Sequence, residues 1–170
     1  VVAWKLATED PTERAAQALL REGATPKTVR VVGNTVIDAL QWTLGREIDN
    51  SRAWESRYDF IAGRTVILVT AHRRENHGAG LAGVFQALAQ LARERPEVAI
   101  LFPVHPNPNV RSAVEAYLPG TENVHLLDPL AYPEFVWLMH RAKVLVSDSG
   151  GVQEEAPTLR RPVVALREST

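Results

Sequence analysis

The second half of the chain alternates short apolar runs with amphipathic stretches, and this alternation constrains the fold more than any other feature. The runs are apolar throughout rather than at every second residue, which predicts strands buried on both faces of a parallel sheet. We therefore predict an α/β fold, a Rossmann-like parallel sheet with helices on both faces. The predicted strands are 65–70, 98–103, 123–127, 143–147 and 162–166, and the predicted helices are 81–94, 108–117, 132–142 and 151–159.

Polar residues follow two of these strands in a way that predicts one shared ligand site. In the usual Rossmann order, 3-2-1-4-5, the first and fourth strands lie side by side at the topological switch point, where ligands bind beyond the strand ends. Residues 71–76 (AHRREN) follow the first strand, and residues 148–151 (DSGG) follow the fourth. The two most polar strand exits are therefore expected to meet.

The turn of Ser149, Gly150 and Gly151 joins an apolar strand to a helix, which is how α/β proteins build an anion site. Glycine lets the backbone approach a ligand closely, and the unpaired N–H groups of the first helical turn point at a phosphate. We expect Glu154 and Glu155 in that first turn, with one of them accepting hydrogen bonds from sugar hydroxyls. Together these features predict a nucleotide or nucleotide-sugar ligand. A serine nucleophile is disfavoured, because a nucleophile elbow needs Gly-x-Ser-x-Gly.

His72 is the candidate catalytic residue from its position just past the first strand. An imidazole can transfer a proton, or when protonated can stabilise charge on a departing phosphate. The alternative is a solvated turn whose charged side chains pair with one another. Of Arg73 and Arg74, one is expected to bind phosphate and the other to be structural.

His105 and Phe135 have both a functional and a structural interpretation. His105 lies in a proline-rich loop after the second strand, where a ligand contact and a purely structural role are equally compatible with the spacing. Phe135 follows the third strand and either stacks on a nucleobase or belongs to the core. No group of His, Asp and Glu residues has metal-ligand spacing, so we predict no bound metal.

The composition excludes several classes of protein. The 170 residues are 45% hydrophobic and 23% charged, with a net charge of -1, which is typical of a globular protein and not of a dedicated nucleic-acid binder. The apolar runs are too short to span a membrane, and the absence of cysteine fits a cytoplasmic protein. The abrupt ends suggest an excerpt of a longer chain. Several arginines are expected to be scattered on the solvated surface: Arg21, Arg46, Arg52, Arg57, Arg93, Arg95, Arg160 and Arg161.

The first part of the chain has weaker signals. Asp10 followed by Glu13 predicts a capping box that opens a helix, and Gly23 is expected to end that helix. A short strand is predicted at 29–32 and a second helix at about 35–46. The polar stretch 48–63 is interpreted as a connector.

With these residues in view, the sequence resembles the bacterial non-hydrolysing UDP-N-acetylglucosamine 2-epimerase family. The matching segments are 32–38 (VGNTVID), 70–76 (TAHRREN), 103–111 (PVHPNPNVR), 135–139 (FVWLM) and 148–157 (DSGGVQEEAP). The resemblance implies two Rossmann-like domains facing across a cleft, as in GT-B glycosyltransferases. Residues 1–62 would then be the end of the N-terminal domain plus interdomain linker helices, and 63–170 a C-terminal UDP-binding domain.

The resemblance implies interconversion of UDP-GlcNAc and UDP-ManNAc, by elimination of UDP to a 2-acetamidoglucal and re-addition from the opposite face. It implies no cofactor, a cytoplasmic homodimer, a role in cell-surface polysaccharide biosynthesis, and no nucleic-acid or membrane partner. The excerpt alone is expected to be inactive. The alternatives are a hydrolysing relative that releases ManNAc and UDP, a GT-B glycosyltransferase that uses a UDP-sugar, and a non-catalytic nucleotide-sensing module.

The resemblance also assigns roles to particular residues. His72 matches the active-site histidine beside the pyrophosphate. Arg73 and His105 match positions that hold a second, activating UDP-GlcNAc in some bacterial members. Leu130 departs from the pattern, because some members have a polar residue there. The remaining matches are the pyrophosphate-binding turn, the carboxylate on the ribose hydroxyls and the residue near the uracil: Ser149, Gly150 and Gly151, then Glu155, then Phe135.

Overall fold

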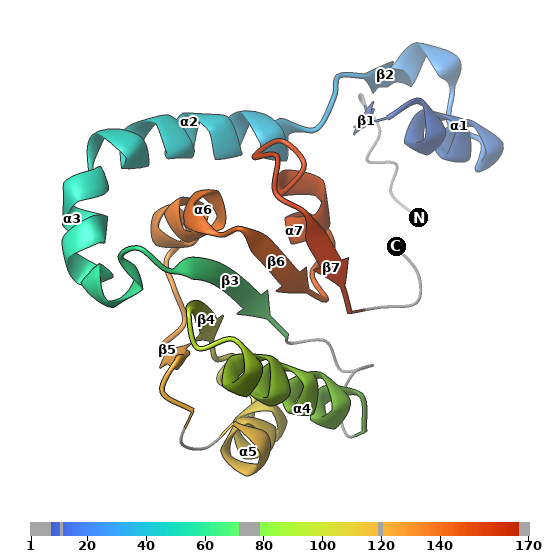
Figure 1. The fold of residues 1–170 in the computed structure, drawn as a ribbon. Coiled ribbons are helices and arrows are strands. Elements are labelled where there is room, and N and C mark those ends of the chain that lie inside the picture. Colours follow the sequence, from blue (N-terminus) through green and yellow to red (C-terminus); the bar gives the residue numbers. More distant parts are fainter. Residues whose placement is uncertain (1–7, 11, 72–78, 119–120, 167–170) are drawn as a thin grey trace. The chain divides into compact units, whose positions relative to one another are not determined.

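The computed structural model describes residues 8–10, 12–71, 79–118 and 121–166 (Figure 1). Its contacts divide the chain into two compact units, residues 1–42 and 43–170, and each is described by itself. In the first unit, strand β1 (Thr8–Asp10) pairs in parallel with strand β2 (Val29–Val31). Helix α1 (Glu13–Arg21) and a short 3-10 helix, η1 (Pro26–Thr28), connect the two strands.

Helix α1 begins at a different cap from the predicted one. The N-cap is Thr12, whose Oγ1 accepts a hydrogen bond from the amide of Ala15 at 3.1 Å. Asp10 cannot serve as the cap, because it is the last residue of β1 and pairs with Val31. The helix ends as expected before Gly23, which adopts the left-handed conformation (φ +91°) that glycine tolerates best.

Helix α2 (Thr35–Asp49) runs from the first unit into the second. It is followed by helix α3 (Ser51–Arg57) and a 3-10 helix, η2 (Asp59–Ile61), so the prediction of a connector over 48–63 is wrong. Helix α3 has only 7 residues, too few to show a clear apolar period, and its stability comes from tertiary packing. The ring of Trp54 packs against that of Trp137, with centroids 6.4 Å apart.

The second unit contains a five-stranded parallel sheet. Its strands are β3 (Thr65–Thr70), β4 (Val98–Pro103), β5 (Val124–Leu127), β6 (Val144–Ser147) and β7 (Val163–Ala165). The spatial order is β5-β4-β3-β6-β7 and every neighbouring pair is parallel. This is the 3-2-1-4-5 order, so the prediction of a Rossmann-like sheet with β3 beside β6 is confirmed.

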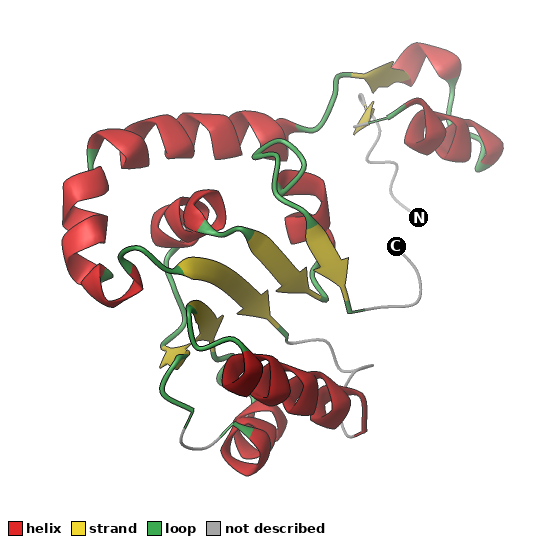
Figure 2. Ribbon diagram, in the orientation of Figure 1, coloured by secondary structure: helices red, strands yellow, loops and turns green. Residues whose placement is uncertain are grey.

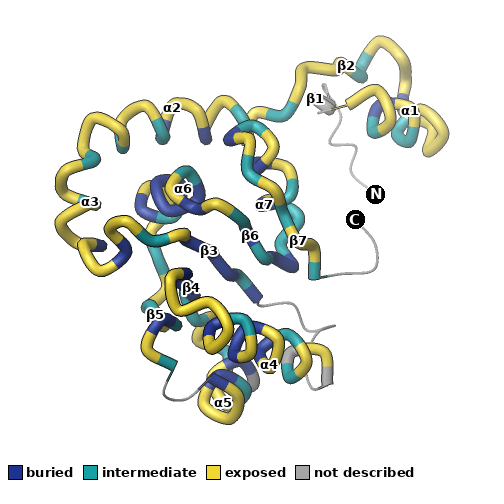
Figure 3. Tube along the Cα trace, viewed as in Figure 1, coloured by how far each residue is buried: buried dark blue, intermediate teal, exposed yellow. Residues whose placement is uncertain are grey.

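Helices cover both faces of this sheet (Figure 2). Helices α4 (Ala79–Glu94) and α5 (Pro108–Tyr117) lie on one face, and α6 (Tyr132–Arg141) and α7 (Gly150–Glu155) lie on the other. Strands β3 and β4 are buried over most of their length, as expected of central parallel strands (Figure 3). Across the described ranges, no helix combines the length and apolar character needed to cross a membrane.

Helix α6 is fixed to the segment before the sheet by a buried carboxylate. Glu134 is 5% exposed, and its Oε1 accepts a hydrogen bond from the hydroxyl of Tyr58 at 2.7 Å. The same oxygen forms an ion pair with Nε of Arg57 at 3.1 Å. The ring of Tyr58 stacks on that of Trp137, with centroids 5.8 Å apart. Burial and the neighbouring carboxylate raise the pKa of Tyr58, so its hydroxyl stays protonated and donates.

We predict that Glu134→Ala lowers the free energy of unfolding by about 1–3 kcal/mol, because it leaves the hydroxyl of Tyr58 and the guanidinium of Arg57 without their acceptor. Urea unfolding measures the effect. The matched control is Glu122→Ala, which removes an exposed carboxylate and is expected to change stability by less than about 0.5 kcal/mol. Equal stabilities of the two variants would show that the buried network contributes nothing.

Candidate nucleotide-binding site

A pocket of about 260 Å³ lies at the carboxyl ends of the central strands. Its walls come from the ends of β3 and β4, the loop before α6, and the start of α7; among the lining residues are Thr70, Pro103, His105, Leu130, Phe135 and Ser149. This is the position predicted from strand order, since β3 is the first strand and has β4 on one side and β6 on the other. The volume is slightly below the range typical of ligand pockets, so this pocket would hold only part of a larger ligand.

Two strand-end hydroxyls hold the turn that begins α7. Oγ1 of Thr70, at the end of β3, lies 2.7 Å from Oγ of Ser147, at the end of β6. The Ser147 oxygen also accepts a hydrogen bond from the amide of Ser149 at 2.9 Å. The Ser149 amide thus already has an acceptor in this structure, and the prediction that the turn binds phosphate depends on the amides of Gly150 and Gly151. The Ser149 hydroxyl caps no helical amide and remains suited to donate to a ligand.

The two glycines that follow are the first residues of α7. The amides of the first helical turn have no partner inside the helix, so those of Gly150 and Gly151 are suited to an anion. The fold itself does not need a glycine at 151. An added Cβ would meet only Oγ of Ser149, at 3.8 Å, and the residue is not in the left-handed region. The missing side chain at 151 leaves the backbone of the turn open to a ligand.

The carboxylates after the turn lie farther along the helix than predicted. Glu154 and Glu155 are the last two residues of the 6-residue helix α7, not part of its first turn. Glu155 is 6% exposed and accepts a hydrogen bond from the hydroxyl of Tyr132, on α6, at 2.7 Å. Burial raises the pKa of Glu155, whereas the bond from Tyr132 opposes that rise. Tyr132 thus fixes the orientation of the carboxyl group.

The pocket brings together three of the residues predicted from sequence. Phe135, half-buried on α6, lines it together with Ser149 and with the exposed His105, whose Nδ1 accepts a hydrogen bond from the amide of Asn107 at 3.2 Å. Gly150, Gly151 and Glu155 lie on α7 and are not among the residues that line this cavity. His72, Arg73 and Arg74 lie outside the described residues.

Sequence reasoning missed the residues that support the site. Thr70 and Ser147 were predicted only as the last residues of strands, and Tyr132 only as the first residue of a helix. A polar residue in the last position of two adjacent strands was the available signal for the first pair. No sequence pattern indicated the contact between Tyr132 and Glu155, since 23 positions separate them. Within the parts of the chain that the structure describes, no three His, Asp or Glu side chains form a group suited to a metal.

Comparison with known proteins agrees with this geometry. The family model described as UDP-N-acetylglucosamine 2-epimerase matches residues 7–170. The chain belongs to this family. A UDP-N-acetylglucosamine 2-epimerase of Yersinia pestis is 46% identical over 164 residues, which are 94% of this chain and 44% of the relative. The chain thus spans less than half the length of that UDP-N-acetylglucosamine 2-epimerase.

Solved structures of the family resemble this chain closely. The UDP-GlcNAc 2-epimerase of Neisseria meningitidis bound to UDP-GlcNAc superimposes with a TM-score of 0.89 at 43% identity, covering 94% of this chain and 44% of that protein. The Methanocaldococcus jannaschii enzyme in complex with UDP-GlcNAc and UDP has a TM-score of 0.77 at 29% identity, covering 96% of this chain and 46% of the other. The fold is therefore that of the family.

Proposed function

We propose that this chain is the UDP-binding part of a UDP-N-acetylglucosamine 2-epimerase that interconverts UDP-GlcNAc and UDP-ManNAc. The observation that carries the proposal is the pocket at the ends of β3 and β4, which joins Ser149 at the start of α7 with Phe135 on α6. In this pocket the hydroxyl of Ser149 is a donor suited to a pyrophosphate, and the ring of Phe135 is suited to a uracil. Residues 1–62 are proposed as the end of an N-terminal domain with its linker helices, and 63–170 as the UDP-binding domain.

The proposed reaction begins with cleavage of the bond between the anomeric carbon and the phosphate oxygen. The electron pair of that bond goes to the departing UDP, and the proton at C2 is removed to give a 2-acetamidoglucal. Donors near the phosphate lower the barrier because they bind the charge that develops there. We assign this role to the amides of Gly150 and Gly151, the hydroxyl of Ser149 and the imidazole of His72. Re-addition of UDP with protonation at the other face gives the epimer.

Glu155 is proposed to accept hydrogen bonds from the ribose hydroxyls, because its orientation is fixed by Tyr132. We predict that Glu155→Gln weakens UDP binding about tenfold, the difference between a charged and a neutral acceptor, and leaves binding of 2′,3′-dideoxy-UDP unchanged. Burial raises the pKa of Glu155, so on acidification this carboxylate becomes protonated at a pH above the usual carboxyl range. The preference for UDP over 2′,3′-dideoxy-UDP is expected to decline in that pH range. Calorimetry with both ligands measures this, and an equal loss for both would place the ribose elsewhere.

The product distinguishes the proposal from its alternatives. The complete protein that carries this chain, incubated with UDP-GlcNAc in D₂O, is expected to yield UDP-ManNAc with deuterium at C2 and no free sugar. Release of ManNAc and UDP would instead establish the hydrolysing reaction, because water and re-addition compete for the same glucal. Turnover only with an added sugar acceptor would indicate a glycosyltransferase, and UDP binding without turnover would indicate a sensing module.

Three further properties are proposed on the family resemblance. His105 and Arg73 would contact a second, activating UDP-GlcNAc, and the position of His105 on the pocket wall supports its part in this. The complete protein would act as a cytoplasmic homodimer. Its product would serve cell-surface polysaccharide biosynthesis.

A further inference from the structure

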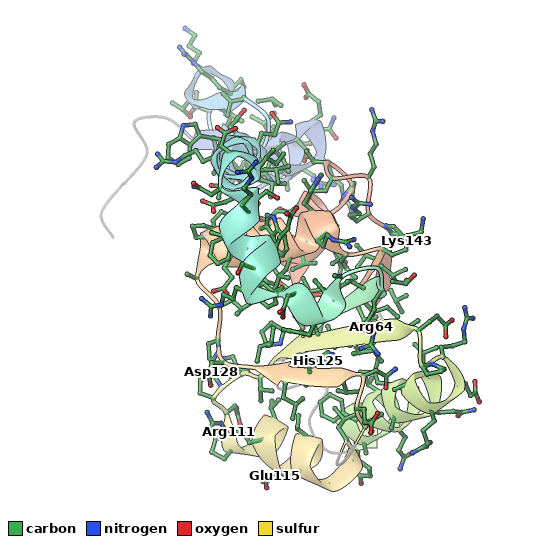
Figure 4. All side chains as sticks on the ribbon, turned by 60° about the vertical axis from the view of Figure 1, so that its left-hand side comes forward. Arg64, Arg111, Glu115, His125, Asp128 and Lys143 are labelled. Atoms are coloured by element: carbon green, nitrogen blue, oxygen red, sulfur yellow. The ribbon has the colours of Figure 1, made fainter. Side chains whose placement is uncertain are left out.

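A second cavity, of about 380 Å³, lies at the opposite edge of the sheet, where the strands begin. Five basic side chains line it, and none of its lining residues is acidic: Arg64, His140, Arg141, Lys143 and Arg161. Arg64 and Lys143 lie on the same side of the molecule (Figure 4). The cavity differs in character from the candidate nucleotide site, which is lined mainly by apolar residues and prolines.

The parallel sheet is what brings these basic residues together. Arg64 directly precedes β3 and Lys143 directly precedes β6, which is the parallel neighbour of β3. The amide of Lys143 donates to the carbonyl of Val66 at 2.8 Å, which fixes this register. His140 and Arg141 end α6, and Arg161 lies just before β7. The expectation that Arg161 is one of several scattered surface arginines is therefore wrong.

The positive charge of this cluster is not neutralised within the described part of the chain. There, none of the five side chains forms an ion pair with a carboxylate. Nη2 of Arg161 donates to the carbonyl of His140 at 2.5 Å, and its Nε is buried without a hydrogen-bond partner among the described residues. Burial lowers the pKa of His140, and the charge of Arg161 lowers it further.

The carboxyl end of α6 explains only part of this arrangement. A helix carries about half a negative charge at its carboxyl end, which favours His140, Arg141 and the bond from Arg161. That partial charge cannot balance four permanent cations. Holding like charges beside one another, with one guanidinium nitrogen buried and unpaired, costs free energy unless an anion binds. Arg141 and Lys143 are exposed and hydrated, whereas Arg64 and Arg161 are half-buried, so an anion held between these four cations would lower the free energy of the cluster.

We propose that this cavity is a second anion site, which binds a small, multiply charged phosphate compound. Guanidinium groups bind phosphate oxygens in pairs, and the lysine ammonium adds a further charge. A concave cavity of this volume, with cations on several walls, suits a compact polyanion better than an extended polymer. Thr65 and Thr70 bound β3, so the site lies about 16 Å from the candidate nucleotide pocket and holds a separate molecule.

The test measures binding of inorganic pyrophosphate to the complete protein by calorimetry, with UDP at saturation and about 150 mM salt to screen weak surface attraction. We expect one binding event, and we expect Arg64→Gln combined with Lys143→Gln to weaken it at least tenfold. The matched control is Arg52→Gln combined with Arg93→Gln, which removes the same charge from exposed residues outside the cavity. The control is expected to change the affinity less than twofold.

A second measurement on the unmodified protein does not depend on the folding of the variants. A bound anion beside His140 favours its protonated form, so pyrophosphate is expected to raise the pKa of His140, followed by NMR of the ring. It is expected to raise the pKa of His125 less, because only Arg64 of the cavity acts on that ring. Equal weakening by both double variants, or no response of His140, would overturn the proposal. So would tighter binding of a single-stranded oligonucleotide than of pyrophosphate. Failure of UDP to bind would contradict the proposed function. The anion site would still be tested independently, by the affinities of the two double variants for pyrophosphate.

Discussion

The Gly151→Val variant is expected to lose about 100-fold in affinity for UDP, roughly 3 kcal/mol, without a matching loss of stability. Each charge-assisted hydrogen bond from a backbone amide to phosphate contributes about 1.5–3 kcal/mol, and a branched side chain at 151 keeps the phosphate from the amides of the turn. The fold tolerates the change, because a Cβ at 151 meets only Oγ of Ser149, at 3.8 Å. Glycine and valine also differ by only a few tenths of a kcal/mol in helix propensity.

Calorimetry with UDP and a thermal melt of the complete protein measure both quantities. The matched control is Gly83→Val, on α4, where an added Cβ has nothing within 4 Å. This control is expected to keep both the affinity for UDP and the melting temperature. Unchanged affinity in Gly151→Val would show that the phosphates do not lie on this turn.

The His72→Asn variant is expected to lower kcat about 100-fold or more, roughly 3 kcal/mol, with a much smaller change in KM. The reason is that a donor to the departing phosphate interacts more strongly as the bond breaks than in the ground state. UDP should still bind through Ser149, Gly150 and Gly151, so calorimetry with UDP should show little change.

Steady-state kinetics with UDP-GlcNAc measure the effect of His72→Asn. The matched control is His125→Asn, which alters a half-buried histidine whose ring packs against Phe60 at a centroid distance of 4.4 Å. This control is expected to lower the melting temperature and to leave kcat near the unmodified value. A normal kcat in His72→Asn would remove the histidine from the mechanism.

The sheet and its ligand-binding edge were predictable because their signals are local and repeated. Strands β3 and β4 and helix α5 have the predicted bounds, since each apolar run or period ends at a clear change of residue type. The strand order followed from the regular alternation of strands and helices. The strand order also predicted that residues 148–151 lie at this edge of the sheet, and Ser149 lines the pocket there.

The sequence-based predictions failed where tertiary contacts outweigh local signals. Asp10 is a good cap in isolation, but its pairing with Val31 in the sheet leaves Thr12 to cap α1. Helix α3 was missed because it depends on the packing of Trp54 against Trp137. The end of helix α7 is a different case with a local cause: the helix ends at Glu155 instead of extending to 159, since Pro157 has no amide to continue it.

The basic cavity and the fixed carboxylate were beyond sequence reasoning for a related reason. Arg64 and Arg161 are nearly a hundred positions apart, and only the parallel pairing of β3, β6 and β7 places them around one cavity. Likewise, the contact between Tyr132 and Glu155 depends on how α6 and α7 pack on the same face of the sheet. A cluster of like charges leaves no recognisable pattern in the sequence when its members come from several different elements.

The central claim is that the pyrophosphate of UDP binds at the start of α7, between the ends of β3 and β6. A crystal structure of the complete protein with UDP tests it most directly. The expected result places phosphate oxygens about 2.7–3.1 Å from the amides of Gly150 and Gly151, with the uracil beside Phe135. Phosphate density away from this turn, or a uracil remote from Phe135, would contradict the account.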